Sequence, residues 1–488
     1  MSIDRNSPDA PSFRLLTEEK LKAIHDGALM VLEEVGMEVA HEGAREMLLA
    51  NGGTLEGEIL IKIPRSLVES SLESAPGSFS LYNRRGEEAI KLGAGMTYYG
   101  AGVTNLAYQE IDGDLHDFTL EDMEKVAHLA DALPNIDFVA TPGVIKQRPD
   151  LRVELIDQMA FIRLSNNTTM PLVILTPDPY QLEDIYEMCE LIAGGADAFN
   201  AKPFMMPYLN PVSPLLFNPE TVDKLFLAND RGTPVVLQAA PPVGGSAPVT
   251  VAAGLVISAA ESLMGLVLSQ LRNPGTPFVT GVVPFVMDMR SGNTAATGPD
   301  MLHMMIAMGE IAKFWGLPSL GVGGGGDSKV PDEQAAFEVV HYSQGVVLGG
   351  VDMAFDAGCL ECGLLWTPEV LCYADEAIGM HRGFIEGLKV DDTTLALDVI
   401  KEVGPGGFFV GHQHTRDHFR ELWDPTLTSW EPRDMWQERG STTMLERARA
   451  KVRKLREEHK VEPLPADVVA AMQAVVDRRE AVLEPEDD

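Results

Sequence analysis

Cysteine is scarce in this chain of 488 residues, which contains four. Four thiols are too few for the disulfide scaffold of a small secreted protein, and a chain of this length can bury a core without cross-links. The low count fits a reducing compartment, and no basic start followed by an apolar segment marks a signal peptide near residue 1. We therefore expect a cytoplasmic protein.

Basic residues are also few, since 38 Lys and Arg stand against 73 Asp and Glu and give a net charge of −35. Such a surface repels the phosphates of nucleic acids and of anionic lipids, so we expect neither a nucleic-acid nor a membrane partner. It mildly favours cationic or zwitterionic ligands. The apolar fraction of 45% and the charged fraction of 23% are those of a folded globular protein.

Long apolar runs are missing with one exception, residues 249–271, which are long enough to cross a membrane. Glu261, Ser262 and Gln270 interrupt this run, and no basic residue follows until Arg272. A helix buried on most sides in a large α/β protein has the same composition. We predict a buried helix.

The rhythm of apolar residues divides the chain into four parts. Residues 1–12 form a disordered tail rich in Ser, Pro and Asp, and residues 13–118 form a helical subdomain with small antiparallel strands. Over 119–424, helices alternate with eight short apolar runs, the last and weakest being GFFVG at 407–411. This alternation predicts an α/β fold, a (β/α)₈ TIM barrel, with a doubly wound parallel sheet as the alternative. Residues 425–488 are predicted to be helices packed outside the barrel.

In such a barrel the chemistry lies at the carboxyl ends of the strands. The residues expected around this mouth are Tyr208, Asn210, Gln238, Phe355 and His412, with Tyr98 on the N-terminal subdomain placed to cover it. Several of them are aromatic, and ring faces attract quaternary ammonium groups. A cage is expected from at least two of Tyr98, Tyr99, Tyr208, Phe355 and Trp366.

A glycine-rich segment, GVGGGG at 321–326, matches the dinucleotide fingerprint formally. In that fingerprint the glycines run directly into a helix, whereas here residues 327–331 intervene before the helix signal at Asp332. Bound NAD is therefore disfavoured. Four consecutive glycines at a strand end predict instead the close approach of a large ligand to bare backbone, with a flexible surface loop as the alternative.

Metal chemistry has two candidate sites. Cys359 and Cys362 form a C-x-x-C motif, which is half a zinc site or a redox pair, but no second such motif exists, so we expect packing residues. His412 and His414 would form a metal pair at a strand end, as in barrel hydrolases, yet no matching carboxylates are evident. No bound metal is expected, and a metal-dependent hydrolase stays open as an alternative.

Motifs spread over most of residues 15–480 resemble the trimethylamine methyltransferase family, including members that lack pyrrolysine and act on quaternary amines. The matching stretches are LEEVGMEV at 32–39, SAPGSFSLYNRRG at 74–86, PVSPLLF at 211–217, the apolar stretch from GGSAPVT to NPGTP, DSKVPDEQAAFE at 327–338 and HTRDHFREL at 414–422. The resemblance implies a (β/α)₈ barrel. It also implies transfer of a methyl group from an amine to the cobalt of a corrinoid (cobalamin) carried by a separate partner protein.

One departure from the family pattern concerns the substrate. Trimethylamine enzymes carry pyrrolysine at the part of the barrel where this chain has only glycines around Val322. A quaternary ammonium leaves as a neutral amine, so its transfer needs no side-chain nucleophile or general acid. The resemblance therefore implies a quaternary amine, such as glycine betaine, as the methyl donor.

The resemblance also implies roles for the mouth residues. Tyr98, Tyr208 and Phe355 would pack against the ammonium, and Asn210, Gln238 and His412 would hydrogen-bond a carboxylate or hydroxyl of the substrate. The predicted cofactor-binding residues are Gly323, Gly324, Gly325 and Gly326, which would leave room for the corrinoid, and Asp327, which would fix the loop. A homo-oligomer is expected. A non-catalytic betaine-binding protein is a second alternative.

Overall fold

The computed structural model describes residues 10–146 and 152–483, so most of the predicted N-terminal tail lies outside the described residues. Its centre is a sheet of eight parallel strands. In spatial order these are β15 (Phe278–Val282), β13 (Val235–Ala239), β11 (Met205–Leu209), β10 (Leu172–Ile174), β9 (Phe138–Ala140), β6 (Tyr98–Ala101), β19 (Met353–Ala357) and β18 (Leu320–Val322). A parallel bridge between Thr280 and Ser319 joins the two outer strands. The sheet is thus closed, and the predicted (β/α)₈ barrel is confirmed.

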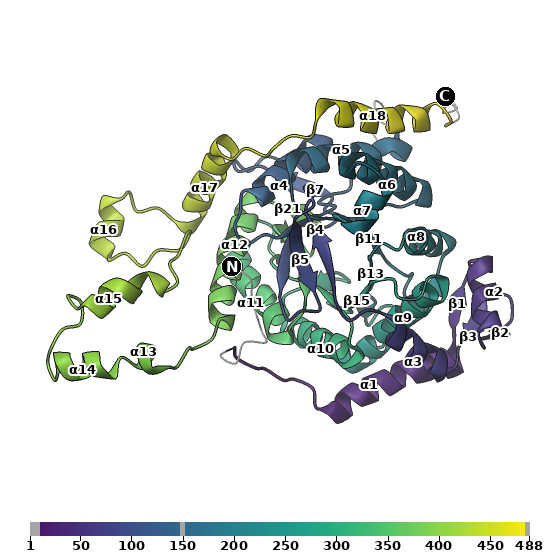
Figure 1. Cartoon of the computed structure of the whole chain (residues 1–488), viewed down its shortest axis with the longest axis horizontal. Helices are drawn as coiled ribbons and strands as arrows, with labels where there is room; N and C mark the ends of the chain where they lie inside the picture. Colours follow the sequence, from purple (N-terminus) through teal and green to yellow (C-terminus); the bar gives the residue numbers. More distant parts are fainter. Residues whose placement is uncertain (1–9, 147–151, 484–488) are drawn as a thin grey trace.

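One long helix follows each barrel strand and covers the outside of the sheet (Figure 1). The eight helices are α4 (Leu120–Asp131), α5 (Ile156–Asn167), α6 (Pro179–Ala193), α8 (Pro219–Asp230), α9 (Val251–Arg272), α10 (Pro299–Trp315), α11 (Glu333–Gly349) and α12 (Pro368–Ile385). Local sequence sets their starts: Thr119 and Asp122 form a capping box for α4, and proline occupies the first turn of four others, α6, α8, α10 and α12. The five residues of β13 are all buried, as expected for a strand covered on both faces.

The prediction of the eighth strand is wrong. Residues 407–411 form turns and irregular structure outside the barrel, while β6, assigned above to the N-terminal subdomain, is a barrel strand between β9 and β19. Strand β6 has only four residues and lies among short antiparallel strands, so its pattern resembles theirs. Its four residues are nonetheless buried, and a Cβ at Gly100 would lie 2.2 Å from the Phe138 ring of the neighbouring strand. The barrel therefore spans 98–385 rather than 119–424.

The N-terminal segment packs on two sides of the barrel. Helices α1 (Glu18–Met30) and α3 (Arg65–Ser74) lie against α9, and one turn of π-helix, Val31–Val35, extends α1. A small sheet beside them contains β2 (Thr54–Glu56), β3 (Leu60–Lys62), β1 (Met37–Val39) and β12 (Leu216–Phe217), with α2 (Glu42–Ala50) following β1. The hairpin of β4 (Phe79–Tyr82) and β5 (Glu88–Leu92) contacts the amino end of the barrel, where Lys91 N donates to Tyr98 Oη.

Helix α9 contains the apolar run that is long enough to span a membrane. It lies between α1 and α3 on one side and β13 and β15 on the other, and 72% of its most apolar window is buried in the protein. Its buried Glu261 accepts hydrogen bonds from Ser213 Oγ at 2.7 Å and Leu215 N at 2.8 Å, which satisfies the carboxylate away from solvent. The prediction of a buried helix is confirmed.

Two small sheets border the carboxyl end of the barrel. One contains β14 (Pro242–Val243), β16 (Phe285–Met287) and β17 (Thr294–Ala295), and the other contains β20 (Cys359–Leu360), β21 (Leu365–Trp366), β7 (Ala107–Gln109) and β8 (Leu115–Asp117). The rim they form surrounds the cavity described below. A short helix, α7 (Ala196–Ala201), lies at the opposite, amino end of the strands.

The C-terminal helices pack outside the barrel, as predicted: α17 (Met444–Glu458) lies on α12, and α18 (Ala466–Glu480) lies on α6. Between α12 and α17 the chain forms an arm, residues 386–443, that projects away from the barrel (Figure 1). Its helices are α13 (Asp392–Leu395), α14 (Leu397–Val403), α15 (Gln413–His418) and α16 (Arg433–Glu438), and none of them buries a residue.

Candidate active site at the carboxyl end of the barrel

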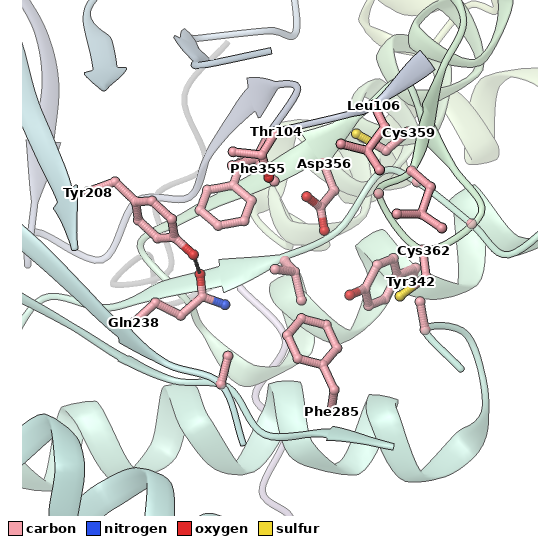
Figure 2. A pocket seen from close by; sticks show the side chains of 18 residues that line it. Thr104, Leu106, Tyr208, Gln238, Phe285, Tyr342, Phe355, Asp356, Cys359 and Cys362 are labelled. Carbon is pink, nitrogen blue, oxygen red and sulfur yellow. Dashed lines mark hydrogen bonds between the residues drawn. The ribbon is translucent and has the colours of Figure 1, made fainter. Parts of the chain in front are cut away.

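A cavity of about 310 Å³ opens at the carboxyl ends of the barrel strands (Figure 2). Residues at or just after the ends of six strands line it, as the barrel prediction required. Of the sequence-predicted site residues, the structure brings together Tyr208, Gln238, Phe355, Gly325 and Gly326. The volume of the cavity is at the lower end of the range of ~300–1,000 Å³ that is typical of small-molecule sites, which suits a compact ligand.

Aromatic rings form much of the wall. Tyr208 of β11 and Phe355 of β19 meet edge to face, with centroids 5.4 Å apart and ring planes at 89°. Phe285 of β16 lies across the cavity from them (Figure 2). Two members of the predicted cage are therefore neighbours here, and a third ring comes from a residue that the sequence analysis missed. Trp366, also considered for the cage, stacks on Tyr108 and does not line the cavity.

A short hydrogen-bond chain fixes the polar side of the cavity. Tyr208 Oη donates to Gln238 Oε1 at 2.5 Å, and it accepts from Asn210 Nδ2 at 3.1 Å. Asn210 Nδ2 also donates to Gln238 O at 2.9 Å, so Asn210 supports the pair from behind and is not part of the lining. Burial raises the pKa of Tyr208, which keeps its hydroxyl protonated and able to donate. The Gln238 Nε2 atom is left to face the cavity (Figure 2).

Asp356 is the one charged side chain among the described residues that line the cavity. It follows Phe355 directly, and in a regular strand consecutive side chains point to opposite faces. Here the register between β19 and β6 shifts between Ala354 and Ala357, and Asp356 takes a φ of +84°. This bulge turns both side chains inward. Burial raises the pKa of Asp356 to about 7, and no described residue donates a hydrogen bond to its carboxylate.

Tyr342 and the two cysteines complete the floor. The buried Tyr342 Oη, on α11, has no hydrogen-bond partner among the described residues. Asn105 Nδ2 donates to Cys359 Sγ at 3.3 Å, and burial raises the pKa of Cys362 to about 12 and that of Cys359 well above its usual value. Thiols of such pKa are protonated at neutral pH and are poor nucleophiles. The packing interpretation of the C-x-x-C motif fits this environment.

Close packing within the protein accounts for the four consecutive glycines. A Cβ at Gly323 would lie 2.8 Å from Val346, one at Gly325 2.8 Å from the carbonyl oxygen of Cys359, and one at Gly326 2.6 Å from Glu338 Oε2. Gly324 has a φ of +94°, which only glycine adopts readily. The loop is buried rather than flexible, and only Gly325 and Gly326 reach the cavity.

Asp327 fixes this loop to the segment before α10. Its carboxylate accepts hydrogen bonds from Ala296 N at 2.9 Å and from both the backbone and the hydroxyl of Thr297. Glu338, on α11, accepts in turn from Asp327 N at 2.7 Å and Ser328 N at 2.9 Å. Two carboxylates thus hold the glycine loop in one position.

Two predicted site residues lie elsewhere. Tyr98 begins β6 at the amino end of the barrel and bonds to β5, so it does not cover the mouth. His412 lies on the arm, where its Nδ1 accepts from His414 N and caps α15. Both errors follow from the strand assignment, because residues 407–411 do not form the strand that would have carried His412 to the mouth.

The proposed metal pair His412 and His414 is therefore remote from the cavity. Within the described residues, one group of three potential ligands has all its ligand atoms within 4.8 Å: Glu110, His116 and Asp122. Lys125 Nζ already donates to both carboxylates of that group, at 2.8 and 3.1 Å. The ammonium group of Lys125 thus already pairs with both carboxylates of this group.

Sequence reasoning missed several lining residues, of which Phe285, Tyr342 and Asp356 have the side chains that matter most for the chemistry of the cavity. Phe285 follows β15 within a small rim sheet, and Tyr342 lies on a helix rather than at a strand end, so neither falls under the strand-end rule. Asp356 ends the same run as Phe355. Strict alternation places it on the far face, and only the glycine at 358, two residues later, hints at an irregular strand end.

Comparison with known proteins now identifies the family. The family model described as trimethylamine methyltransferase (MTTB) matches residues 3–484. The glycine betaine methyltransferase of Desulfitobacterium hafniense strain Y51 is 30% identical over 471 residues, covering 96% of this chain and 98% of that protein. The trimethylamine methyltransferase MttB of Methanosarcina barkeri strain Fusaro is 29% identical, covering 97% of this chain and 96% of its own.

A solved structure agrees in fold. The crystal structure of the monomethylamine methyltransferase MtmB of Methanosarcina barkeri superposes with a TM-score of 0.52 at 12% identity, covering 90% of this chain and 88% of that one. At that identity the likeness concerns the fold alone. The family match, by contrast, extends over nearly the whole sequence and includes the barrel, the rim and the arm. The chain belongs to the trimethylamine methyltransferase family and is a methyltransferase.

Proposed function

We propose that this enzyme transfers a methyl group from a quaternary amine to the Co(I) corrinoid of a separate partner protein. The observation that carries the proposal is the cavity itself, a small aromatic chamber with a half-buried carboxylate at the barrel mouth. Ring faces and a carboxylate are the groups that recognise a quaternary ammonium. The similarity to the glycine betaine methyltransferase of Desulfitobacterium hafniense supports a donor of this chemical class.

The residues of this chain act by binding and orientation. The rings of Tyr208, Phe355 and Phe285 hold the ammonium and keep water from it, and the Gln238 amide is available to an oxygen of the substrate. One N-methyl group would then face the opening of the cavity. Holding it there converts much of the entropic cost of a two-molecule reaction into binding.

The bond changes balance without a protein acid or nucleophile. The C–N bond breaks and its electron pair stays on nitrogen, so the amine leaves neutral. The Co(I) corrinoid supplies the electron pair of the new carbon–cobalt bond. The lining thiols of Cys359 and Cys362 have raised pKa values and stay protonated, which agrees with a reaction that uses no side-chain nucleophile.

The cavity fits the small donor rather than the macrocycle of the acceptor. With about 310 Å³ it would hold an alkylammonium, while a corrin ring would stay above the rim. The rim residues on the loop side are small, since Gly325, Gly326 and Gly363 all line the cavity. These residues would contact the partner's corrinoid, and Asp327 would hold their loop in place.

An anaerobic absorbance assay tests the proposal. The purified protein is mixed with chemically reduced cob(I)alamin and, in turn, with glycine betaine, proline betaine, carnitine and choline. We expect one compound to convert the Co(I) spectrum to that of the methylated corrinoid, with unchanged rate after dialysis against a chelator. Tight binding of a quaternary amine without any conversion would support a non-catalytic binding protein instead. Loss of activity on chelation would support metal chemistry.

The proposal includes the homo-oligomer and the cytoplasmic location expected above. Large apolar side chains on the arm support self-association, since Phe408, Val410, Leu422 and Trp430 are 88%, 82%, 75% and 67% exposed. Sedimentation of the purified protein measures the oligomer directly. A monomer at micromolar concentration would contradict this part of the proposal.

A further inference from the structure

The charge of the cavity points to a narrower class of substrate. Its lining, among the described residues, contains one carboxylate, that of Asp356, and no Lys, Arg or His side chain. Glycine betaine and related zwitterions carry a carboxylate beside their ammonium group. A site built for such a molecule needs a cationic or strongly donating partner for that carboxylate, because a buried charge without a partner is costly.

The geometry of β19 indicates that Asp356 is directed into the cavity by the fold. The bulge between Ala354 and Ala357 and the φ of +84° place its side chain beside that of Phe355, in a conformation that costs free energy for a residue other than glycine. The carboxylate receives no hydrogen bond from a described residue, and no described salt bridge neutralises it. This partly buried carboxylate therefore has no cationic partner among the described residues.

The other titratable side chains that line the cavity, among the described residues, are uncharged at neutral pH. Burial raises the pKa of Tyr208 and Tyr342, and the charge of Asp356 contributes to both shifts, so its field reaches each side of the cavity. The charge of Asp356 also contributes to the raised pKa values of Cys359 and Cys362. All four groups stay protonated between pH 6 and 8, and none of them compensates the carboxylate.

A neighbouring cavity does not supply enough positive charge to offset the carboxylate of Asp356. It has a volume of about 320 Å³, shares Cys362 and Leu364 with the first cavity, and contains Lys329. Asp327 and Glu361 line the same space, and Lys329 Nζ donates to the carbonyl oxygen of Asp327 at 2.6 Å. Among the described residues that line the two cavities, one ammonium group faces three carboxylates, so the lining of the combined site is net negative.

Neutral polar groups remain for the rest of the substrate, among them the Thr104 hydroxyl and two further side chains. Gln238 Nε2 faces the cavity, and the buried Tyr342 Oη lacks a partner among the described residues. An amide and a phenol match a hydroxyl or another uncharged polar group, which can both donate and accept. Neither group compensates a carboxylate that would lie close to Asp356.

We propose that the methyl donor is a net cation, a quaternary ammonium with an uncharged polar tail, and that Asp356 is its counter-ion and excludes zwitterionic betaines. This inference rests on the proposed function for the reaction and adds the specificity. Asp356 thereby acts in two ways. It attracts the ammonium head, and it repels any donor whose second group is a carboxylate.

Choline and glycine betaine form a matched pair of probes, because both carry a trimethylammonium head and differ in a hydroxymethyl against a carboxylate tail. We would measure their dissociation constants by calorimetry at pH 8 with the full-length protein, Asp356→Asn and a control, Asp197→Asn. Asp197 is exposed at the opposite end of the barrel, so its substitution removes the same unit of charge far from the cavity.

We expect wild-type protein to bind choline at least tenfold more tightly than glycine betaine. Asp356→Asn should weaken choline binding at least tenfold and leave glycine betaine binding unchanged or stronger, and Asp197→Asn should alter neither. Circular dichroism confirms that both variants are folded. Glycine betaine bound as tightly as choline, or choline affinity unchanged in folded Asp356→Asn, would overturn the inference.

The pH dependence gives a second readout that a merely structural role would not change. Choline affinity should rise by about tenfold between pH 6 and pH 8 as Asp356 ionises, and Asp356→Asn should remove this rise. A wild-type affinity that does not change with pH would contradict the role of the carboxylate.

The cob(I)alamin assay separates the two proposals. Demethylation of glycine betaine but not of choline would overturn the counter-ion inference while upholding the methyltransferase function. Asp356-dependent choline binding without methyl transfer would overturn the proposed function while upholding the inference. In active protein, Asp356→Asn should raise KM with little loss of kcat, because positive charge leaves the nitrogen as the C–N bond breaks.

Discussion

Tyr208 and Gln238 are each the fourth residue of neighbouring strands, β11 and β13, and the hydroxyl of Tyr208 donates to Gln238 Oε1 at 2.5 Å. One side chain thereby presents a ring face to the cavity and sets the orientation of the other. The amide of Gln238 is held with its nitrogen toward the substrate. Recognition of the ammonium and recognition of the tail are linked by this bond.

This pairing makes two substitutions at Tyr208 informative. Tyr208→Phe keeps the ring and should change choline affinity less than threefold, but it leaves Gln238 Oε1 without its donor and should lower the free energy of unfolding by about 1–2 kcal/mol. Tyr208→Leu removes the ring face and should weaken binding by about 1–2 kcal/mol, or roughly 5–30-fold. Calorimetry and urea denaturation measure the two effects. Equal affinities for the two variants would remove Tyr208 from the cage.

The carboxylate of Asp356 should reduce the stability of the folded protein at alkaline pH. Because the pKa of Asp356 is raised by burial to about 7, the folded protein binds one more proton than the unfolded chain between about pH 4 and pH 7. The free energy of unfolding therefore falls as pH rises through this window. Asp356→Asn lacks this loss and should be more stable than wild type at pH 8, by on the order of 2–4 kcal/mol, with little difference near pH 4.

Urea denaturation at pH 4.5 and pH 8 measures that difference. Asp197→Asn is again the control, since its side chain is exposed and its substitution should change stability by less than about 0.5 kcal/mol at either pH. A variant Asp356→Asn that is less stable than wild type at pH 8 would show that the carboxylate has a stabilising partner.

The glycine loop should tolerate no side chain where Glu338 supports it. In Gly326→Ala the new Cβ would lie 2.6 Å from Glu338 Oε2, and that carboxylate cannot withdraw without losing its bonds to Asp327 N and Ser328 N. We expect a loss of about 1–3 kcal/mol in the free energy of unfolding. Gly411→Ala, with open space around it, is the matched control and should be neutral. Similar denaturation midpoints for the two variants would argue against this account of the loop.

The end of the arm depends on one carboxylate. Glu376, on α12, accepts hydrogen bonds from the backbone and hydroxyl of Thr426 and Thr428 and from Leu427 N. Burial acts to raise the pKa of Glu376, but these donors hold it below its usual value. Glu376→Gln places an amide NH₂ against N–H donors and should cost about 1.5–3 kcal/mol.

Limited proteolysis measures how firmly the arm is attached to the barrel. The Glu376→Gln variant should be cleaved faster between α16 and α17, whereas Glu386→Gln, an exposed position at the end of the same helix, should behave as wild type. Wild-type arm attachment should also weaken in acid, as Glu376 becomes protonated below its lowered pKa. Unchanged cleavage of Glu376→Gln would mean that other contacts hold this segment.

Most of the barrel was predictable because each βα unit carries its own signal: a short apolar run, a turn residue and a capped helix. The positions of Tyr208, Gln238 and Phe355 followed from the strand-end rule. Strand β6 escaped because it lies among short antiparallel strands, and β7 and β8 separate it from its helix, α4, so it lacks the strand-then-helix pattern of the other barrel units. His412 was misplaced through the same error, since one strand had to be supplied from elsewhere.

The position of Asp356 in the cavity could not be predicted from the sequence pattern around it. The inward direction of Asp356 depends on a bulge formed with β6, a strand more than 250 residues earlier in the chain. Tyr342 reaches the cavity from a helix because α11 packs on β18. The sequence of α11 alone does not predict this packing. Such residues become visible only when distant segments meet.

Strand β6 has a consequence for synthesis of the chain. It pairs with β9 on one side and with β19 on the other, and β19 ends at Ala357. While the ribosome is still making the intervening segment, one edge of β6 exposes unpaired N–H and C=O groups. Unpaired edges invite contacts with other nascent chains, and long-range pairing of this kind is slow. The barrel therefore keeps an open edge until β19, the last of its eight strands in the sequence, has left the ribosome.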